Sequence, residues 1–360
     1  MRVIVKIGTS SVTAAAGEVD TLALGKFTTE VINARRAGHE VIVVTSGAIT
    51  AGVQTLGIQR PTAPERLQAV SAVGQIDLMR VYSELLGRHG AVPGQVLLAP
   101  HDFRDRNQYL HARATFEHLL ALGVVPVVNE NDAVADDAIR YGDNDRIAAL
   151  VANLLRADLM VLLTDTAGVL TDDPRVNPDA SLIEEIREVD HSIEGVAGTA
   201  GERGSGGMSS KLAAAKMASW SGVRTVIAGA ARVGVLQDAI EGVIGVGTTV
   251  PARDAHVSAR KLWIGFAVTA AGVIEVDDGA RRALLERGRS LLPAGVVAVD
   301  GSFAVGDAVE IVGPDRREFA KGLAGLDAEA LRSAAGRRTD ELPPGNQTTV
   351  VHADDLVLLP

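Results

Sequence analysis

The chain has 360 residues, a length that favours two domains rather than one. Hydrophobic residues make up 47% and charged residues 22%, which is a globular composition and excludes a fibrous or disordered protein. Cysteine is absent, which excludes disulfides, thiolate nucleophiles and cysteine-containing zinc sites, and the formal net charge of −10 weighs against duplex nucleic acid as the main partner.

Short apolar runs alternate with longer helical stretches through the first 255 residues. Continuous apolar strands separated by helices are typical of a largely parallel sheet that is covered on both faces. Ligands bind such sheets at the carboxyl ends of the strands, which is where this chain carries its polar and glycine-rich motifs. The predicted strands are Val3–Ile7, Val41–Val44, Gln95–Leu98, Val124–Val128, Leu159–Leu163 and Thr225–Ile227, and the predicted helices are Leu22–Arg36, Arg146–Leu155 and one that ends near Trp220.

The pattern changes near residues 248–260, which are rich in Pro, Ala and charged residues and are typical of a linker. Beyond Trp263 the runs become short and are broken by Gly and Asp, a pattern that indicates a small β-barrel. We therefore predict a first domain over residues 1–255, a linker over 256–266 and a C-terminal β-barrel domain over 267–360. The strands predicted there are Gly272–Val276, Gly295–Val299, Ala308–Val312 and Asp355–Leu358, with one helix over Asp278–Arg287.

The first two strands end in residues that suit an anion. Lys6 lies near the end of the first strand, where its ammonium group can emerge to meet a negative charge. Gly8 and Thr9 follow with backbone N–H groups and a hydroxyl that can approach a phosphate, although an edge lysine before a simple turn is the alternative. Ser46 and Gly47 follow the second strand, and they suit a carboxylate or phosphate at a helix N-terminus unless Ser46 is only an N-cap.

Three later segments are more polar than a turn requires. Asn129–Asp132 places amide and carboxylate groups in a row, where they could fix an α-ammonium group or form a solvated loop. Gly142–Asp145 opens a helix, and its two aspartates could position lysines or a hydrated Mg²⁺, or cap the helix. Thr164 and Asp165 begin a loop that could hold the base and ribose of a nucleotide.

The last motif is a glycine-rich helix start. A Gly-Gly entry, serine hydroxyls and a lysine in the first turn make an anion site, although the Gly-Lys-Ser/Thr of a P-loop is missing. A flexible loop before a helix is the alternative. The motif consists of Ser205, Gly206, Gly207, Met208, Ser209, Ser210 and Lys211.

Taken together, these motifs resemble the amino-acid kinase family in their order and intervals, over about residues 1–255. The matching stretches are Val-Lys-x-Gly-Thr-Ser, Val-Thr-Ser-Gly-Ala-Ile, Asn-Glu-Asn-Asp, Gly-Asp-Asn-Asp, Leu-Leu-Thr-Asp and Gly-Gly-Met-x-x-Lys. The family often has Thr where this chain has Ser205 and Ser210, and both are hydroxyl residues. The C-terminal strands resemble a PUA domain, a module named for RNA-modifying enzymes.

The resemblance implies a three-layer αβα fold with a mostly parallel sheet and an ATP-dependent phosphotransferase. The implied reaction converts the γ-carboxylate of L-glutamate to L-glutamyl 5-phosphate, the first step of L-proline biosynthesis. Because a carboxylate is already ionised at neutral pH, no general base is expected. The difficulty is electrostatic, since an anion must approach a polyanion in line.

The resemblance also implies a role for individual residues. Lys6 and Lys211 would neutralise charge on the transferred phosphoryl group, and Asp145 would orient them, with Asp143 as a helper. The implied ATP-binding residues are Lys6, Gly8, Thr9, Thr164, Asp165, Ser205, Gly206, Gly207, Met208, Ser209, Ser210 and Lys211, and the implied glutamate-binding residues are Ser46, Gly47, Asp132 and Asn144.

Further partners follow from the resemblance. It implies Mg²⁺ held on the nucleotide rather than by protein ligands, inhibition by L-proline, a γ-glutamyl phosphate reductase as pathway partner, and a homo-oligomer. The first apolar run, Val3–Val5, has only three residues before Lys6, too few for a signal peptide, and no apolar run approaches the roughly 18 residues of a membrane helix. We expect a cytoplasmic protein with no membrane partner.

Two alternatives stay open. The same phosphate-binding residues would serve a kinase that acts on acetylglutamate, aspartate, carbamate or a nucleotide. The PUA-like region could instead give the protein an RNA-binding or regulatory role. Residues 261–360 carry 11 Lys and Arg against 15 Asp and Glu, a balance that argues against RNA as a partner.

Overall fold

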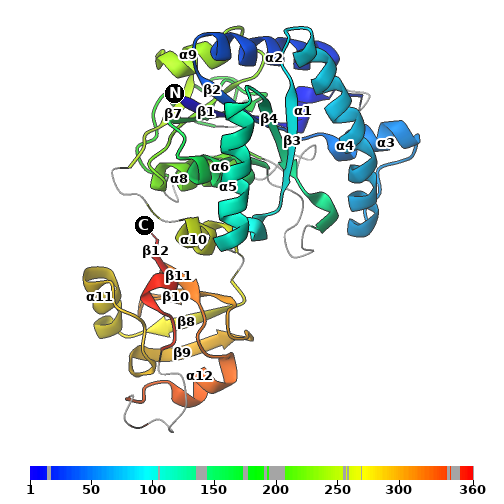
Figure 1. The fold of residues 1–360 in the computed structure, drawn as a ribbon. Coiled ribbons are helices and arrows are strands. Elements are labelled where there is room, and N and C mark those ends of the chain that lie inside the picture. The colour runs from blue at the N-terminus through cyan, green and yellow to red at the C-terminus, as the bar shows by residue number, and fades with distance from the viewer. Residues whose placement is uncertain are drawn as a thin grey trace. The chain divides into compact units, whose positions relative to one another are not determined.

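The structure is a computed structural model, and it describes residues 1–13, 18–103, 106–134, 144–172, 177–189, 193, 207–253, 257, 259–268, 270–338, 341 and 349–359. The chain forms two compact units, Met1–His256 and Val257–Pro360, and each has its own hydrophobic core (Figure 1). No helix in the described ranges is long and apolar enough to cross a membrane.

The first unit is built on a sheet whose described strands lie in the order β3, β4, β2, β1, β5, β6 and β7. Their bounds are β1 Arg2–Ile7, β2 Glu40–Val44, β3 Pro93–Leu98, β4 Val125–Glu130, β5 Leu159–Thr164, β6 Arg224–Gly229 and β7 Gly247–Val250. All neighbours pair in parallel except β6 and β7, which are antiparallel. The central strands are buried on both faces, which is why they appear in the sequence as unbroken apolar runs.

Helices cover both faces of this sheet. Their bounds are α1 Thr9–Val12, α2 Thr21–Arg36, α3 Ala48–Leu56, α4 Pro64–Gly87, α5 Arg106–Ala121, α6 Asn144–Leu155, α8 Met208–Trp220 and α9 Val235–Glu241. The residues of α2, α4 and α9 share one core with Val3, Val5 and Ile7 of β1. On the other face α6 packs on β1 and α8 packs on β6, and these two helices contact each other. The predicted three-layer αβα arrangement with a mostly parallel sheet is therefore confirmed.

Three features of the first unit differ from the sequence prediction. Helices α1, α3, α4, α5 and α9 were absent from the predicted elements, and α4, with 24 residues, is the longest of them. Strand β4 continues through Asn129 and Glu130, which were predicted to lie beyond its end. Gly247–Val250 is an edge strand and not the start of a linker. Its four residues contain a glycine and two threonines, so no apolar run marks it.

Helices α3 and α4 approach each other at backbone distance. A Cβ on Gly74 would lie 1.9 Å from the carbonyl oxygen of Ala48, and one on Gly52 would lie 2.0 Å from that of Val70. No side chain fits at either position, so both must be glycine for the helices to cross this closely. This contact fixes α4 beside the start of α3, at the carboxyl end of β2.

The second unit contains a five-stranded sheet in the order β12, β11, β10, β8 and β9, as far as the described residues show. The bounds are β8 Gly272–Val276, β9 Val296–Gly301, β10 Ala308–Val312, β11 Glu318–Leu323 and β12 Leu356–Leu358, with helices α10 Ala259–Leu262, α11 Asp278–Arg287 and α12 Ala328–Ala334. Strand β8 pairs in parallel with β10, and the other neighbours are antiparallel. The predicted strands and the helix at Asp278–Arg287 are present.

Strand β11, helices α10 and α12 and a π-helical turn of the second unit were not predicted. Strand β11 contains Lys321, which is buried and donates a hydrogen bond from Nζ to the backbone oxygen of Val268. Two charged residues and a glycine within six residues break the apolar pattern that identifies a strand. The predicted linker also contains α10 and a π-helical turn, Trp263–Ala267.

Candidate active site

Two lysines from distant parts of the sequence meet on one carboxylate. The Nζ atom of Lys6, in β1, lies 2.7 Å from Oδ1 of Asp145, and Nζ of Lys211 lies 3.2 Å from Oδ2 of the same side chain. Asp145 lies in the first turn of α6 and Lys211 in the first turn of α8. The carboxylate is fully buried, and the lysine side chains are 5% exposed. We name these three residues the lysine cluster.

The electrostatics of the lysine cluster keep Asp145 ionised. Burial alone raises the pKa of its carboxyl group, because it removes water from the charged form. The ammonium groups of Lys6 and Lys211, together with hydrogen bonds from Lys6 and Ser210, outweigh burial and lower the pKa from 3.8 to about 2. Asp145 therefore carries a negative charge at any physiological pH and holds the two ammonium groups in place.

The start of α8 lies beside the lysine cluster. Gly207 is the N-cap residue and has no side chain with which to cap the helix, so the first N–H groups of α8 can bind an anion as far as the described residues show. The hydroxyl oxygen of Ser210 lies 2.8 Å from Oδ2 of Asp145 and 2.9 Å from the carbonyl oxygen of Gly207. Met208 and Ser209 belong to the same first turn. The predicted residues Ser205, Gly206 and Asp143 lie outside the described residues.

The residues predicted to bind the nucleotide near the ends of β1 and β5 lie close together, because these two strands are neighbours in the sheet. Ile7 pairs with Leu163, so the residues that follow β1, Gly8 and Thr9, start beside the end of β5. Gly8 is the N-cap of α1 and carries no side chain over Lys6, whose Nζ would lie 3.5 Å from a Cβ there. At the end of β5 the hydroxyl of Thr164 donates to Oδ1 of Asp165 over 3.1 Å.

A chain of hydrogen-bonded amide side chains lies next to the lysine cluster. Gln75, Asn129 and Asn144 are buried, and Gln95 at the outer end of the chain is exposed. Nδ2 of Asn144 donates to Oγ of Ser46 and to Oδ1 of Asn129, both over 3.0 Å, and its Oδ1 accepts from the backbone N–H of Glu130 over 3.1 Å. Nδ2 of Asn129 donates to Oε1 of Gln75 over 2.9 Å, and Nε2 of Gln75 donates to Oε1 of Gln95 over 3.0 Å. We name Ser46, Gln75, Gln95, Asn129 and Asn144 the amide network.

Two groups of the amide network can still form hydrogen bonds with a ligand, one on Asn144 and one on Ser46. Both N–H groups of Asn144 are used within the chain, while its Oδ1 keeps a second lone pair that can accept. The hydroxyl of Ser46 accepts from Asn144 and can donate its own hydrogen. The site therefore presents an acceptor from Asn144 and a donor from Ser46, a pairing that fits an ammonium group and a carboxylate on one molecule.

Gly47 caps α3 in the left-handed conformation, with φ of 108° and ψ of −1°. Ser46 does not cap this helix, because its hydroxyl is directed to Asn144 and no side-chain hydrogen bond caps α3. The simple capping interpretation of Ser46 is therefore wrong. The first N–H groups of α3 stay available beside the Ser46 hydroxyl.

Asp132 follows β4 in a short 3₁₀ turn, Asp132–Val134. The hydroxyl of Ser71 in α4 donates to its Oδ2. Burial raises the pKa of Asp132, and the hydrogen bond from Ser71 opposes that rise by stabilising the ionised form. The structure thus brings Asp132 to the same end of β4 as Asn129, with its carboxylate held by a helix.

Four residues of this site were not predicted as site residues, namely Ser71, Gln75, Gln95 and Asn129. Asn129 lay in the polar run that could fix an α-ammonium group, but it was not named among the glutamate-binding residues. Ser71 and Gln75 are four residues apart on α4 and are both buried, with exposed fractions of 4% and 8%. Polar residues on the buried stripe of a helix are the signal that could have identified them.

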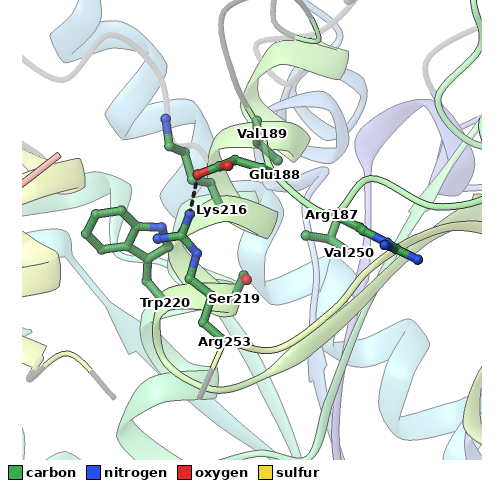
Figure 2. Close-up of a pocket in the computed structure, with 8 residues that line it drawn as sticks. All are labelled: Arg187, Glu188, Val189, Lys216, Ser219, Trp220, Val250 and Arg253. Carbon is green, nitrogen blue, oxygen red and sulfur yellow. Dashed lines mark hydrogen bonds and ion pairs between the residues drawn. The ribbon is translucent and has the colours of Figure 1, made fainter. Parts of the chain in front are cut away.

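A hollow at the other end of α8 is separate from this site (Figure 2). It is lined by Arg187, Glu188, Val189, Lys216, Ser219, Trp220, Val250 and Arg253. The guanidinium carbon of Arg253 lies 4.9 Å from the centroid of the Trp220 ring, and the guanidinium group pairs with Glu188 over 2.7 Å. At about 1.5 Å per residue, Trp220 lies about 14 Å along α8 from Lys211. None of the predicted site residues lines this hollow.

Comparison with known proteins supplies the family. Residues 1–229 match the amino acid kinase family and residues 272–344 match the PUA domain. The chain is 43% identical over 359 residues to a glutamate 5-kinase from Rhodococcus jostii (strain RHA1), covering 99% of this chain and 96% of that protein. It is 41% identical over 364 residues to a glutamate 5-kinase from Pelobacter propionicus (strain DSM 2379 / NBRC 103807 / OttBd1), covering 99% and 97%.

Solved structures share the fold of the first unit. A carbamate kinase from Giardia lamblia bound to AMP-PNP superposes with a TM-score of 0.50 at 19% identity, covering 70% of this chain and 98% of that chain. An isopentenyl phosphate kinase gives a TM-score of 0.50 at 21% identity, covering 69% and 100%. At these identities the comparison shows the fold alone.

Proposed function

The chain belongs to the amino acid kinase family, and from this premise we propose that it transfers the γ-phosphoryl group of ATP to the γ-carboxylate of L-glutamate. The products are L-glutamyl 5-phosphate and ADP. Relatives that are 41–43% identical over nearly the whole chain are named glutamate 5-kinase, which supports glutamate as the acceptor. The observation that carries the proposal is the meeting of Lys6 and Lys211 on one buried carboxylate at the carboxyl ends of the strands.

The lysine cluster addresses the electrostatic part of this reaction. A carboxylate oxygen forms a bond to the γ-phosphorus while the bond from that phosphorus to the bridging oxygen of ADP breaks. Negative charge accumulates on both sides of the transferred group. Lys6 and Lys211, held by Asp145, are placed to stabilise that charge without reorganising, because their positions are set before the substrate binds. No residue has to remove a proton.

The amide network and its neighbours address recognition of the amino acid. An α-ammonium group can donate to Asp132 and to Oδ1 of Asn144. An α-carboxylate can accept from the hydroxyl of Ser46 and from the first N–H groups of α3, which begins after Gly47. These contacts would leave the γ-carboxylate to face the lysine cluster, because Asn144 and Asp145 are adjacent in the first turn of α6.

The residues of the site fit a Mg²⁺ ion that is carried on the nucleotide. Among the described residues, no three His, Asp or Glu side chains gather as a metal site, and both oxygens of Asp145 contact lysines. Mg²⁺ commonly keeps several waters and binds through substrate phosphates. When bound there it would neutralise phosphate charge, and this chain's own residues would supply the remaining cations.

The place of the protein in metabolism follows from the product. An acyl phosphate is consumed rapidly or hydrolysed, so a γ-glutamyl phosphate reductase is the expected partner, in the first steps of L-proline biosynthesis. Inhibition by L-proline, a homo-oligomeric state and a cytoplasmic location belong to the same proposal. Each of these is a testable property of the purified protein or of cells.

The proposal is tested by measuring ADP release from MgATP with a panel of acids. The panel contains L-glutamate, N-acetyl-L-glutamate, L-aspartate and carbamate, and hydroxylamine is added to trap any acyl phosphate as a hydroxamate. We expect both ADP and hydroxamate with L-glutamate. Turnover of another acid in its place would overturn the substrate assignment, and no turnover with any acid would overturn the activity.

A further inference from the structure

We propose that Ser71 of α4 is a positioning residue that sets the affinity for the substrate's amino group by orienting Asp132. The inference rests on the proposed function, since it names how the same site recognises an amino acid. Ser71 itself does not touch the reacting atoms. It acts through the carboxylate to which it donates a hydrogen bond.

The geometry of Asp132 leaves one of its carboxylate oxygens for a ligand. Its Oδ2 accepts from the hydroxyl of Ser71, and within the described residues its Oδ1 has no recorded hydrogen-bond partner. A carboxylate with one oxygen fixed has a defined direction for the other. A hydrogen bond to an ionised group is roughly twice as strong as a neutral one, so Ser71 can hold that direction firmly.

Helix α4 is itself held rigidly where it carries Ser71. Gly74 packs against the backbone of α3 with no room for a side chain, and Gln75 accepts from Asn129 over 2.9 Å. Ser71 and Gln75 are four residues apart and lie on the same face of the helix. One face of α4 therefore holds Asp132 directly, through Ser71. The same face holds Asn144 indirectly, because Gln75 bonds to Asn129 and Asn129 accepts from Asn144. Asp132 and Asn144 are the two proposed acceptors for the ammonium group.

The charge of the expected ligand group is consistent with this arrangement. Burial raises the pKa of Asp132 above its ordinary value, and the hydrogen bond from Ser71 opposes that rise by stabilising the ionised carboxylate that an ammonium group would contact. A primary ammonium has three N–H donors, which can be shared between a carboxylate and an amide oxygen. An amino acid whose nitrogen is acylated has only one N–H and no charge, so Ser71 matters for free amino acids alone.

The experiment is steady-state kinetics of the full chain with L-glutamate and MgATP. We expect Ser71→Ala to raise the KM for L-glutamate about tenfold, because a hydrogen bond to a charged group is lost, while kcat and the KM for ATP change by less than about twofold. Ser71→Cys, which keeps the size of the side chain and a weak donor, should give an intermediate KM. It also serves if Ser71→Ala fails to fold.

A double-mutant cycle separates positioning from a purely structural effect. If Ser71 acts through the Asp132 carboxylate, adding Ser71→Ala to Asp132→Asn should raise the KM for L-glutamate by less than about twofold further. Equal effects of Ser71→Ala in both backgrounds would overturn the proposal, as would a fall in kcat without a change in KM.

A matched control is Ser219→Ala. Ser219 is also a buried helical serine, and its hydroxyl donates to the carbonyl oxygen of Pro251 over 2.7 Å, far along α8 from the lysine cluster. Its loss should lower the unfolding temperature without raising the KM for L-glutamate. If the wild-type chain turns over L-glutamate and Ser71→Ala does so with an unchanged KM, the inference fails while the proposed function stands. Absence of glutamate turnover in the wild type would remove the proposed function instead.

Discussion

The lysine cluster and the amide network meet at the start of α6, where Asp145 and Asn144 are adjacent, but the first consists of charged side chains and the second of neutral ones. In the lysine cluster two ammonium groups form ion pairs with one carboxylate, whereas in the amide network neutral side chains form hydrogen bonds with one another. Charges act strongly over several ångströms in a buried site, which suits a step in which charge moves between groups. Amides act only at hydrogen-bond distance and in fixed directions, which suits recognition of a group that does not change. The division predicts that variants of the lysine cluster lower kcat and variants of the amide network raise KM.

The largest expected effect is the loss of a lysine. Lys211→Ala or Lys6→Ala should lower kcat by about 10²–10³-fold, or roughly 3–4 kcal/mol, because each removes a preorganised donor to the transferred group. The KM for L-glutamate should change little. The measurement is ADP release at saturating substrates, with circular dichroism to check the fold. Lys216→Ala, on the same helix but in the separate hollow, is the control and should keep near-normal turnover. Near-normal turnover in either lysine variant of the cluster would remove that lysine from the mechanism.

Asp145→Asn should lower kcat by about 10²-fold, since both ammonium groups lose the charge that orients them. It should also change the pH dependence of stability. Because the pKa of Asp145 is about 2 in the folded chain against 3.8 when unperturbed, its contribution is complete above pH 3.8 and is lost as pH falls through about 2.

That shift corresponds to about 2 kcal/mol of unfolding free energy, taken as an order of magnitude. Urea unfolding of the wild type and Asp145→Asn between pH 2 and pH 6 measures it. The difference in unfolding free energy between the two proteins should shrink as the pH falls below 4. A difference that stays constant over this range would show that the charge of Asp145 is not stabilised by its surroundings.

Asn144→Ala should affect binding of the substrate rather than the chemical step. It removes an acceptor for the ammonium group and leaves Ser46 and Asn129 without their shared partner. We expect the KM for L-glutamate to rise about 10–100-fold, which corresponds to a hydrogen bond with a charged group, and kcat to fall much less. The measurement is initial rate against L-glutamate concentration. A fall in kcat alone would place Asn144 with the lysine cluster.

The smallest effect is expected for Gln75→Leu. Gln75 lies two side chains from the proposed substrate contact, so its loss should raise the KM for L-glutamate by only about three- to fivefold, less than a direct contact would. It should also cost about 1–3 kcal/mol of stability, because Asn129 and Gln95 lose buried partners. Kinetics and urea unfolding measure the two effects. An unchanged KM with reduced stability would make the outer part of the amide network structural only.

The sequence alone predicted the strands and helices whose pattern is local. β1, β2 and β5 are unbroken apolar runs, and α6 and α8 follow glycine-rich or capped starts. It also predicted Lys6, Asp145 and Lys211 as one group, but only through the resemblance. Their meeting depends on β1, α6 and α8 being neighbours in space, a property that no local pattern contains.

The features that the sequence did not reveal depend on partners far along the chain. Asn129 and Gln75 are separated by 54 positions, and Ser71 and Asp132 by 61. A polar residue on a buried face becomes interpretable only when the group that satisfies it is known. In the second unit β11 was missed for a similar reason, because the backbone oxygen that accepts from Lys321 belongs to Val268.

The positions of the three charged residues along the chain affect how the protein folds during its synthesis. Lys6 leaves the ribosome early, Asp145 after a further 139 residues and Lys211 after 66 more. Until α8 has emerged, β1 and α6 can form only the Lys6–Asp145 half of the ionic contact, and α6 lacks the helix that packs against it. The centre of the sheet therefore becomes fully stable only after α8, Met208–Trp220, has been synthesised, and a chain truncated before residue 207 should be a preferred substrate for proteases.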